Sequence, residues 1–129
     1  MMRRLAGVGI CVLVALAVVM PGSASAAKAP VELTIKPWEP IGLGVGVWKG
    51  RVKSTRTKCM RDAKVTLYYS TGEDNEALGD AQIEKSNGKF FWGGVTDEPD
   101  DGTYFAVAKP TGACKRAESK HIEWPDNRR

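Results

Sequence analysis

Glycine and proline interrupt this chain so often that no long helix fits between them. The 129 residues include 14 glycines and 7 prolines, and no segment after Pro21 shows a convincing helical period of apolar residues. The most helix-compatible segment, residues 74–81, is itself interrupted by Gly79. Between the interruptions lie short segments in which apolar and polar side chains alternate, the pattern of half-buried β-strands. The sequence therefore predicts an all-β fold.

Seven segments are expected to form strands, namely residues 31–35, 47–54, 63–69, 81–84, 90–92, 102–108 and 118–124. Alternation assigns the following side chains to the core: Trp48, Gly50, Val52, Val65, Leu67, Tyr69, Phe90, Trp92, Tyr104, Ala106 and Ala108. Alternation places the following side chains on the outward face: Lys64, Thr66, Tyr68, Phe91, Phe105 and Val107. Lys49, Arg51 and Lys53 also face solvent, which explains the basic stretch 49–58 without a nucleic-acid ligand.

The amino terminus has the three-part layout of a secretory signal peptide. Arg3 and Arg4 precede an apolar run from residue 5 to residue 20, and small residues follow. Cleavage is expected after Ala26, with Ala27 as the close alternative. The apolar run is shorter than the roughly 20 residues that span a bilayer, so no stable membrane span is expected after cleavage. Residues 1–26 are thus the signal peptide, expected to be helical, and its Cys11 is lost with it.

The two cysteines that remain, Cys59 and Cys114, favour a single disulfide, because an exported protein meets an oxidising compartment and the even count allows complete pairing. The chain has no Cys-x-x-Cys and a single histidine, His121, so the usual structural zinc sites cannot be assembled. A thiol nucleophile at Cys114 with His121 as its base is the alternative. Closing a loop of about 55 residues would stabilise the fold by about 4 kcal/mol in the loop-entropy model.

Residues 27–129 have the length of one ordinary domain, with a core expected over residues 47–124. Short strands with frequent turns predict a two-sheet antiparallel sandwich. Asp100, Gly102 and Tyr104 resemble the tyrosine corner of Greek-key sandwiches, in which the phenol bonds to the backbone at the start of a strand. An immunoglobulin-like sandwich is the alternative. True immunoglobulin domains have a cysteine two residues after that tyrosine, where this chain has Ala106.

A set of short motifs in a fixed order resembles the small secreted bacterial domains with a transthyretin-like (prealbumin-like, carboxypeptidase regulatory-like) β-sandwich. The motifs are Gly50-x-Val52, Cys59, Lys64-Val65-Thr66-Leu67-Tyr68, Asn87-Gly88-Lys89-Phe90, Gly102-Thr103-Tyr104-Phe105-Ala106 and Ala113-Cys114-Lys115. The resemblance covers residues 47–124 and leaves residues 31–45 without a counterpart. It implies a seven-stranded Greek-key sandwich with the two cysteines paired, no catalytic residues, and a structural, adhesive or accessory role.

The sequence therefore predicts a secreted, non-enzymatic module that acts outside the cell or at the cell envelope on an unidentified partner, with no cofactor, no metal centre and no nucleic acid. The alternative is a module that binds a carbohydrate or protein ligand, or inhibits an enzyme, through exposed aromatic side chains. Its candidates are Trp38, Tyr68, Phe91 and Phe105. The acidic loop 97–101 raises the further alternative of a weak Ca²⁺ site. A solvated turn that supports the tyrosine corner is favoured over it.

Overall fold

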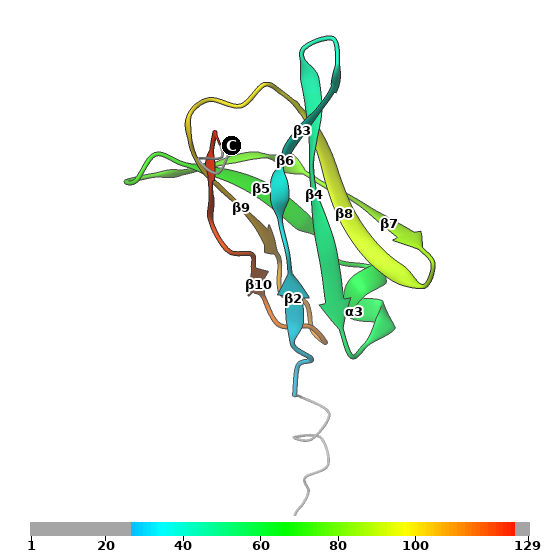
Figure 1. The fold of residues 1–129 in the computed structure, drawn as a ribbon. Coiled ribbons are helices and arrows are strands. Elements are labelled where there is room, and N and C mark those ends of the chain that lie inside the picture. The colour runs from blue at the N-terminus through cyan, green and yellow to red at the C-terminus, as the bar shows by residue number, and fades with distance from the viewer. Residues whose placement is uncertain (1–26, 126–129) are drawn as a thin grey trace, which may run out of the picture.

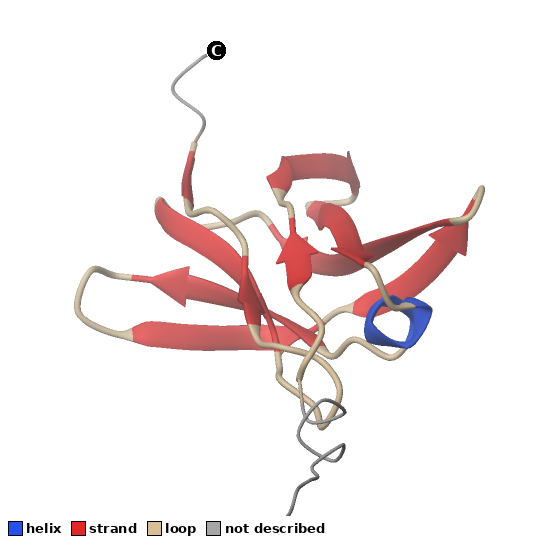
Figure 2. Ribbon diagram, turned by 90° about the horizontal axis from the view of Figure 1, so that it is seen from below, coloured by secondary structure: helices blue, strands red, loops and turns tan. Residues whose placement is uncertain are grey.

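The computed structural model describes residues 27–125, which form two antiparallel sheets packed as a sandwich (Figure 1). The predicted signal-peptide helix and its cleavage site after Ala26 lie outside the described residues. The strands are β2 (Val31–Leu33), β3 (Lys36–Gly42), β4 (Val45–Ser54), β5 (Val65–Ser70), β6 (Asn75–Asp80), β7 (Gln82–Ser86), β8 (Lys89–Asp97), β9 (Gly102–Ala108), β10 (Ala117–Glu118) and β11 (Ile122–Trp124). Figure 2 shows one short helix beside them, α3 (Thr57–Arg61).

The first sheet has the order β2-β4-β8-β7, and β3 also pairs with β4. The second has the order β10-β9-β5-β6, and β11 also pairs with β9. Between β6 and β7 the chain passes from one sheet to the other through the single residue Ala81, whose N–H donates to the Val65 carbonyl at 2.7 Å. The predicted all-β sandwich is confirmed.

The structure has ten strands in its described part, whereas the sequence predicted seven. Strand β3 was missed because Pro37 and Pro40 normally end a strand. The two prolines are tolerated because β3 lies at an edge of the sheet and pairs with β4 through register shifts. Strand β6 was missed because it is exposed along its whole length and has no apolar alternation. The last predicted strand is split around Ser119, which is buried and exchanges hydrogen bonds with the Ala106 backbone.

The core lies between the sheets, and the predicted inward side chains form most of it. Its members are Leu33, Ile35, Trp38, Trp48, Val52, Val65, Leu67, Phe90, Trp92, Tyr104, Ala106, Ala108 and Ala117. The core therefore begins before residue 47, since β2 and β3 contribute to it. Three side chains assigned outward are in fact buried, namely Thr66, Phe105 and Val107. The Thr66 hydroxyl donates to Asp80 Oδ1 at 3.0 Å.

Cys59 and Cys114 form the predicted disulfide, with a sequence separation of 55. Cys59 lies in helix α3 rather than in an irregular loop. Ala29 pairs with the segment around Cys114, because its N–H donates to Ala113 and its carbonyl accepts from Lys115. The chain around α3, the bridge and β10 is called the disulfide end of the sandwich.

The opposite end is called the open end and comprises residues 37–48, 70–79, 94–104 and 122–125. Figure 1 shows the β3–β4 hairpin projecting there beyond both sheets. The predicted tyrosine corner is also at this end: the Tyr104 hydroxyl donates to the Asp100 carbonyl at 2.7 Å. Burial is the main cause that raises the pKa of Tyr104 to about 12.

Candidate functional site

The four aromatic side chains predicted to be exposed do not form a common surface. Trp38 is buried at 8% exposure, so the prediction for it is wrong. It packs edge-on against Trp124, with 5.5 Å between the ring centroids. Phe91 is half-buried on the outer face of the first sheet, where the Arg51 guanidinium lies 5.8 Å from its ring centroid. An aromatic platform built from these residues is therefore not available to a ligand.

Phe105 was predicted to lie outside the core and was a candidate for an exposed ligand-binding ring, but it is only 3% exposed. Its ring is stacked against Tyr68 at 5.4 Å and against His121 at 4.1 Å. Strand alternation places Phe105 on the outer face correctly, but it cannot reveal that neighbouring rings cover it. Tyr68 remains half-buried.

Cys114 has no free thiol to act as a nucleophile, because its sulfur is bonded to Cys59. His121 instead lies 2.6 Å from Glu118 Oε2 through its Nε2. The hydrogen bond with His121 is the main cause that lowers the pKa of Glu118 from its usual value. These side chains form a surface contact that joins β10 to the segment before β11.

The acidic loop 97–101 connects β8 to β9 at the open end, and two phenols hold it through its backbone. Tyr69 donates to the Asp101 carbonyl at 2.9 Å, and Tyr104 bonds to the neighbouring residue as described above. The carboxylates of the loop are left facing solvent. Within residues 27–125, no group of three or more histidine, cysteine or acidic side chains is arranged to hold a metal ion.

Two hollows open beside this loop. The loop hollow, of about 460 Å³, has apolar walls that include Trp48 and Val95 and an acidic rim formed by residues 97–100. The hairpin hollow, of about 470 Å³, lies under the β3–β4 hairpin and is lined by Trp38 and Trp124. Val45 and Glu98 line both hollows, so the two are neighbours that meet at these side chains.

Two buried indole groups at the hollows have N–H donors without an acceptor among residues 27–125. Trp48, which is fully buried, lines the loop hollow, and Trp38 lines the hairpin hollow. Leaving a buried donor unpaired costs about 1 to 3 kcal/mol. Two of the three such buried side-chain donors in residues 27–125 are therefore at the open end, and the third, Arg51 Nε, lies in β4 outside it.

The open end also holds the exposed large apolar side chains. In the described chain the four are Ile41, Leu43, Leu78 and Val95, with exposures from 40% to 104%. Leu43 is at the tip of the hairpin, between two glycines with positive φ, a conformation that turns the chain back in the fewest residues. All four of these exposed side chains of the described chain therefore belong to the segments of the open end.

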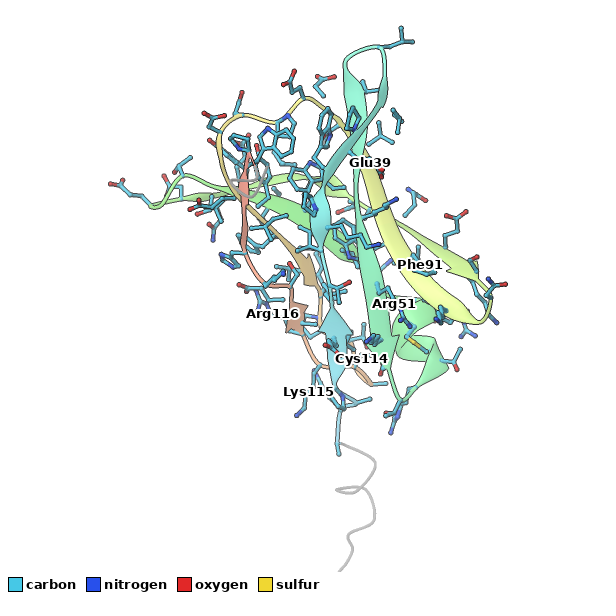
Figure 3. All side chains as sticks on the ribbon, viewed as in Figure 1. Glu39, Arg51, Phe91, Cys114, Lys115 and Arg116 are labelled. Atoms are coloured by element: carbon cyan, nitrogen blue, oxygen red, sulfur yellow. A yellow bond between two sulfur atoms is a disulfide. The ribbon has the colours of Figure 1, made fainter. Side chains whose placement is uncertain are left out.

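Charge divides the molecule along the same axis. Lys49, which follows one of the segments of the open end, reaches Glu39 at 3.1 Å. The segments themselves carry no lysine or arginine and nine carboxylates, namely Glu39, Glu73, Asp74, Glu76, Asp97, Glu98, Asp100, Asp101 and Glu123. The rest of the described chain carries fifteen lysine and arginine side chains against five carboxylates. Figure 3 shows the two sides through Glu39 near the hairpin and Lys115 and Arg116 below it. The net charge of +4 for the whole chain hides this asymmetry, which only the strand pairing reveals.

The site at the open end belongs to a disulfide-bonded antiparallel β-sandwich. Comparison with known protein families and with curated proteins finds no match to the chain. Among residues 27–125, the structure has no helix that is long and apolar enough to cross a membrane.

Proposed function

We propose that the protein is a secreted, non-enzymatic β-sandwich module with an adhesive or accessory role, and that it binds a protein partner at its open end. The observation that carries this proposal is the coincidence at one end of two neighbouring hollows, four exposed apolar side chains and nine carboxylates without a basic residue. Interaction surfaces combine exposed apolar groups with a single sign of charge in this way.

Secretion is supported by the leader 1–26 and by the disulfide, which is typical of exported proteins. A non-enzymatic role is supported by the use of Cys114 in that bridge and by the stacking of His121 on Phe105, since these were the candidate nucleophile and base. We propose a transthyretin-like sandwich on the ordered motifs, several of which lie in β4, β5, β8 and β9. A carbohydrate ligand bound by exposed aromatics is less well supported, because Trp38 and Phe105 are buried.

The first experiment measures the intact mass of the protein secreted with its own leader, with and without a reductant. We expect a chain that starts at Ala27 and is two hydrogens lighter than its reduced form. A chain that keeps its leader and stays with the cells, or two thiols that alkylate without reduction, would contradict a secreted, disulfide-bonded module.

The second experiment measures how much purified protein binds to envelope fractions and to secreted proteins of the source cells. Glu98→Lys alters the junction of the hollows, whereas Glu84→Lys makes the same change in β7, away from the open end. We expect binding that Glu98→Lys removes and Glu84→Lys preserves. Equal binding by all three proteins, or binding by none, would contradict a binding role for the open end.

A further inference from the structure

We propose that the partner presents a cationic segment, a lysine or arginine flanked by apolar residues, which seats over Glu98 with its side chains in the two hollows. This inference rests on the proposed function, because it names the chemistry of the partner that the open end would bind.

The charge of the open end is unbalanced within the described chain. Of its nine carboxylates, Glu39 forms an ion pair, with Lys49 at 3.1 Å, and the four in the loop 97–101 form none with residues 27–125. Carboxylates of one sign gathered on the same segments give this end a negative field, which attracts a cationic ligand. The same field extends beyond contact distance and speeds the approach of a basic partner at low salt.

The shape of the site suits side chains rather than an ion or a planar ring. Glu98 is shared by both hollows, so a charge paired with it leaves an apolar-walled space on either side. Lysine and arginine lay their aliphatic stems along apolar walls and keep the charged group at the polar rim. The Trp48 ring cannot offer a stacking face, because it is fully buried and stacked on Tyr104 at 4.6 Å.

The exposed apolar groups require the partner to be more than a point charge. Leu43 and Ile41 project from the hairpin, and Val95 forms part of the wall of the loop hollow. Burying apolar area contributes about 25 cal/mol per Å², which a hydrated cation alone cannot supply. A segment with apolar residues next to its positive charge covers these side chains and pairs the carboxylates at the same time.

A second copy of this chain fits less well than another protein. Its basic residues lie toward the disulfide end, but the four large exposed apolar side chains of the described chain all lie at the open end. The hollow beside the bridge, of about 60 Å³, is also too small to receive the Leu43 hairpin. The disulfide end of a second copy therefore offers charge without the apolar contact.

The test uses three fluorescein-labelled octapeptides and measures binding by anisotropy. The first contains three arginines separated by leucines, the second has glutamate in place of arginine, and the third has serine in place of leucine. The full mature protein is used, also in a background with Arg128→Ser and Arg129→Ser, so that the positive charges that follow Trp124 cannot take the place of the peptide.

We expect the leucine–arginine peptide to bind and the glutamate peptide not to bind. Glu98→Lys should weaken binding about tenfold, since it replaces an attraction by a like-charge contact, and Glu84→Lys should leave it unchanged. Leu43→Ser should weaken binding of the leucine–arginine peptide several-fold. Any binding of the serine–arginine peptide should be unchanged by this substitution. Raising the salt concentration from 20 to 200 mM should weaken binding, because exposed charges are screened within about a Debye length.

Equal binding of the glutamate peptide, no binding of any peptide, or no effect of Glu98→Lys would overturn the inference. Self-association in analytical ultracentrifugation that Glu98→Lys abolishes would also overturn it, in favour of a second copy. If the envelope binding described above depends on Glu98 but no cationic peptide binds, the inference fails and the proposed function stands.

Discussion

The two ends of the sandwich differ in how completely their side chains are buried and paired. At the disulfide end, Ala29, Cys59 and Cys114 form a small buried cluster, and a covalent bond ties helix α3 to the segment before β10. At the open end the chain leaves apolar side chains in solvent, carboxylates unpaired and two indole donors unsatisfied. The difference teaches that this fold keeps its covalent cross-link apart from its exposed apolar side chains and unsatisfied donors, so that one end can tolerate features that would destabilise a domain on their own.

The largest effect is expected from removing the bridge. Cys59→Ala combined with Cys114→Ala should lower the free energy of unfolding by about 4 kcal/mol, because the unfolded chain regains the freedom of a loop that the bridge closes. Denaturant titration measures the change. If the open end is an independent binding surface, the double variant should bind the same peptides below its unfolding temperature. A loss of less than about 1 kcal/mol would show that the disulfide end does not hold the fold together.

A smaller effect is expected where the open end meets the core. A Cβ at Gly46 would lie 2.4 Å from the Trp38 ring and 2.5 Å from the Glu39 carbonyl, so one of these must shift. Gly46→Ala should lower the free energy of unfolding by about 2 kcal/mol. Gly94→Ala is the control, since a Cβ there meets nothing within 4 Å. Equal effects of the two substitutions would mean that the chain beneath the hollows is loosely packed. That result would contradict the close contact of Gly46 with Trp38.

The tyrosine corner should contribute less. Tyr104→Phe deletes the hydrogen bond to the Asp100 carbonyl and should cost about 1 kcal/mol. The raised pKa of Tyr104 means that the folded state favours the neutral phenol, so this contribution is complete below pH 10 and is lost as the pH rises toward 12. Phenolate absorbance followed together with unfolding measures it. The substitution should flatten the alkaline loss of stability, and an unchanged alkaline profile would speak against this assignment.

The smallest effect is expected at the surface contact between Glu118 and His121. The lowered pKa of Glu118 means that the folded state favours the carboxylate, so its contribution is present above the unfolded pKa near 4.5 and is lost as the pH falls below that value. Because both side chains are partly exposed, Glu118→Gln should cost less than about 0.5 kcal/mol at pH 7. Denaturant titration at pH 7 and pH 3 measures the difference, and a cost above 1 kcal/mol would show that the disulfide end also depends on surface charge.

Side-chain alternation was sufficient to predict the sandwich and most of its core, because Trp48, Val52 and Trp92 lie in regular paired strands. The cysteine count and the predicted export signal were sufficient to predict the bridge. Alternation assigns a face of a strand but not what covers that face. For this reason Phe105, stacked between two rings, was wrongly placed in solvent.

The open end was beyond the reach of sequence reasoning for a different reason. Its carboxylates come from four separate segments, of which only the acidic loop 97–101 stands out in the sequence. Trp38 follows a proline in a segment without clear alternation, so its burial under the hairpin could not be foreseen. Only the pairing of the strands brings Glu39, Glu98 and Glu123 to the same end.

The position of the bridge also determines how the molecule would respond to tension. Ala29 is hydrogen-bonded beside the bridge, whereas Trp124 pairs with Gly102 at the other end, so pulling on the two ends of the described chain loads β2 and β11 in shear. Force then passes from Cys59 directly to Cys114. Once β11 has detached from β9 and the segment before Cys59 has yielded, the bridge bypasses residues 60–113, which are then not extended. Such a module would yield only its two flanking segments before a covalent bond stopped its extension.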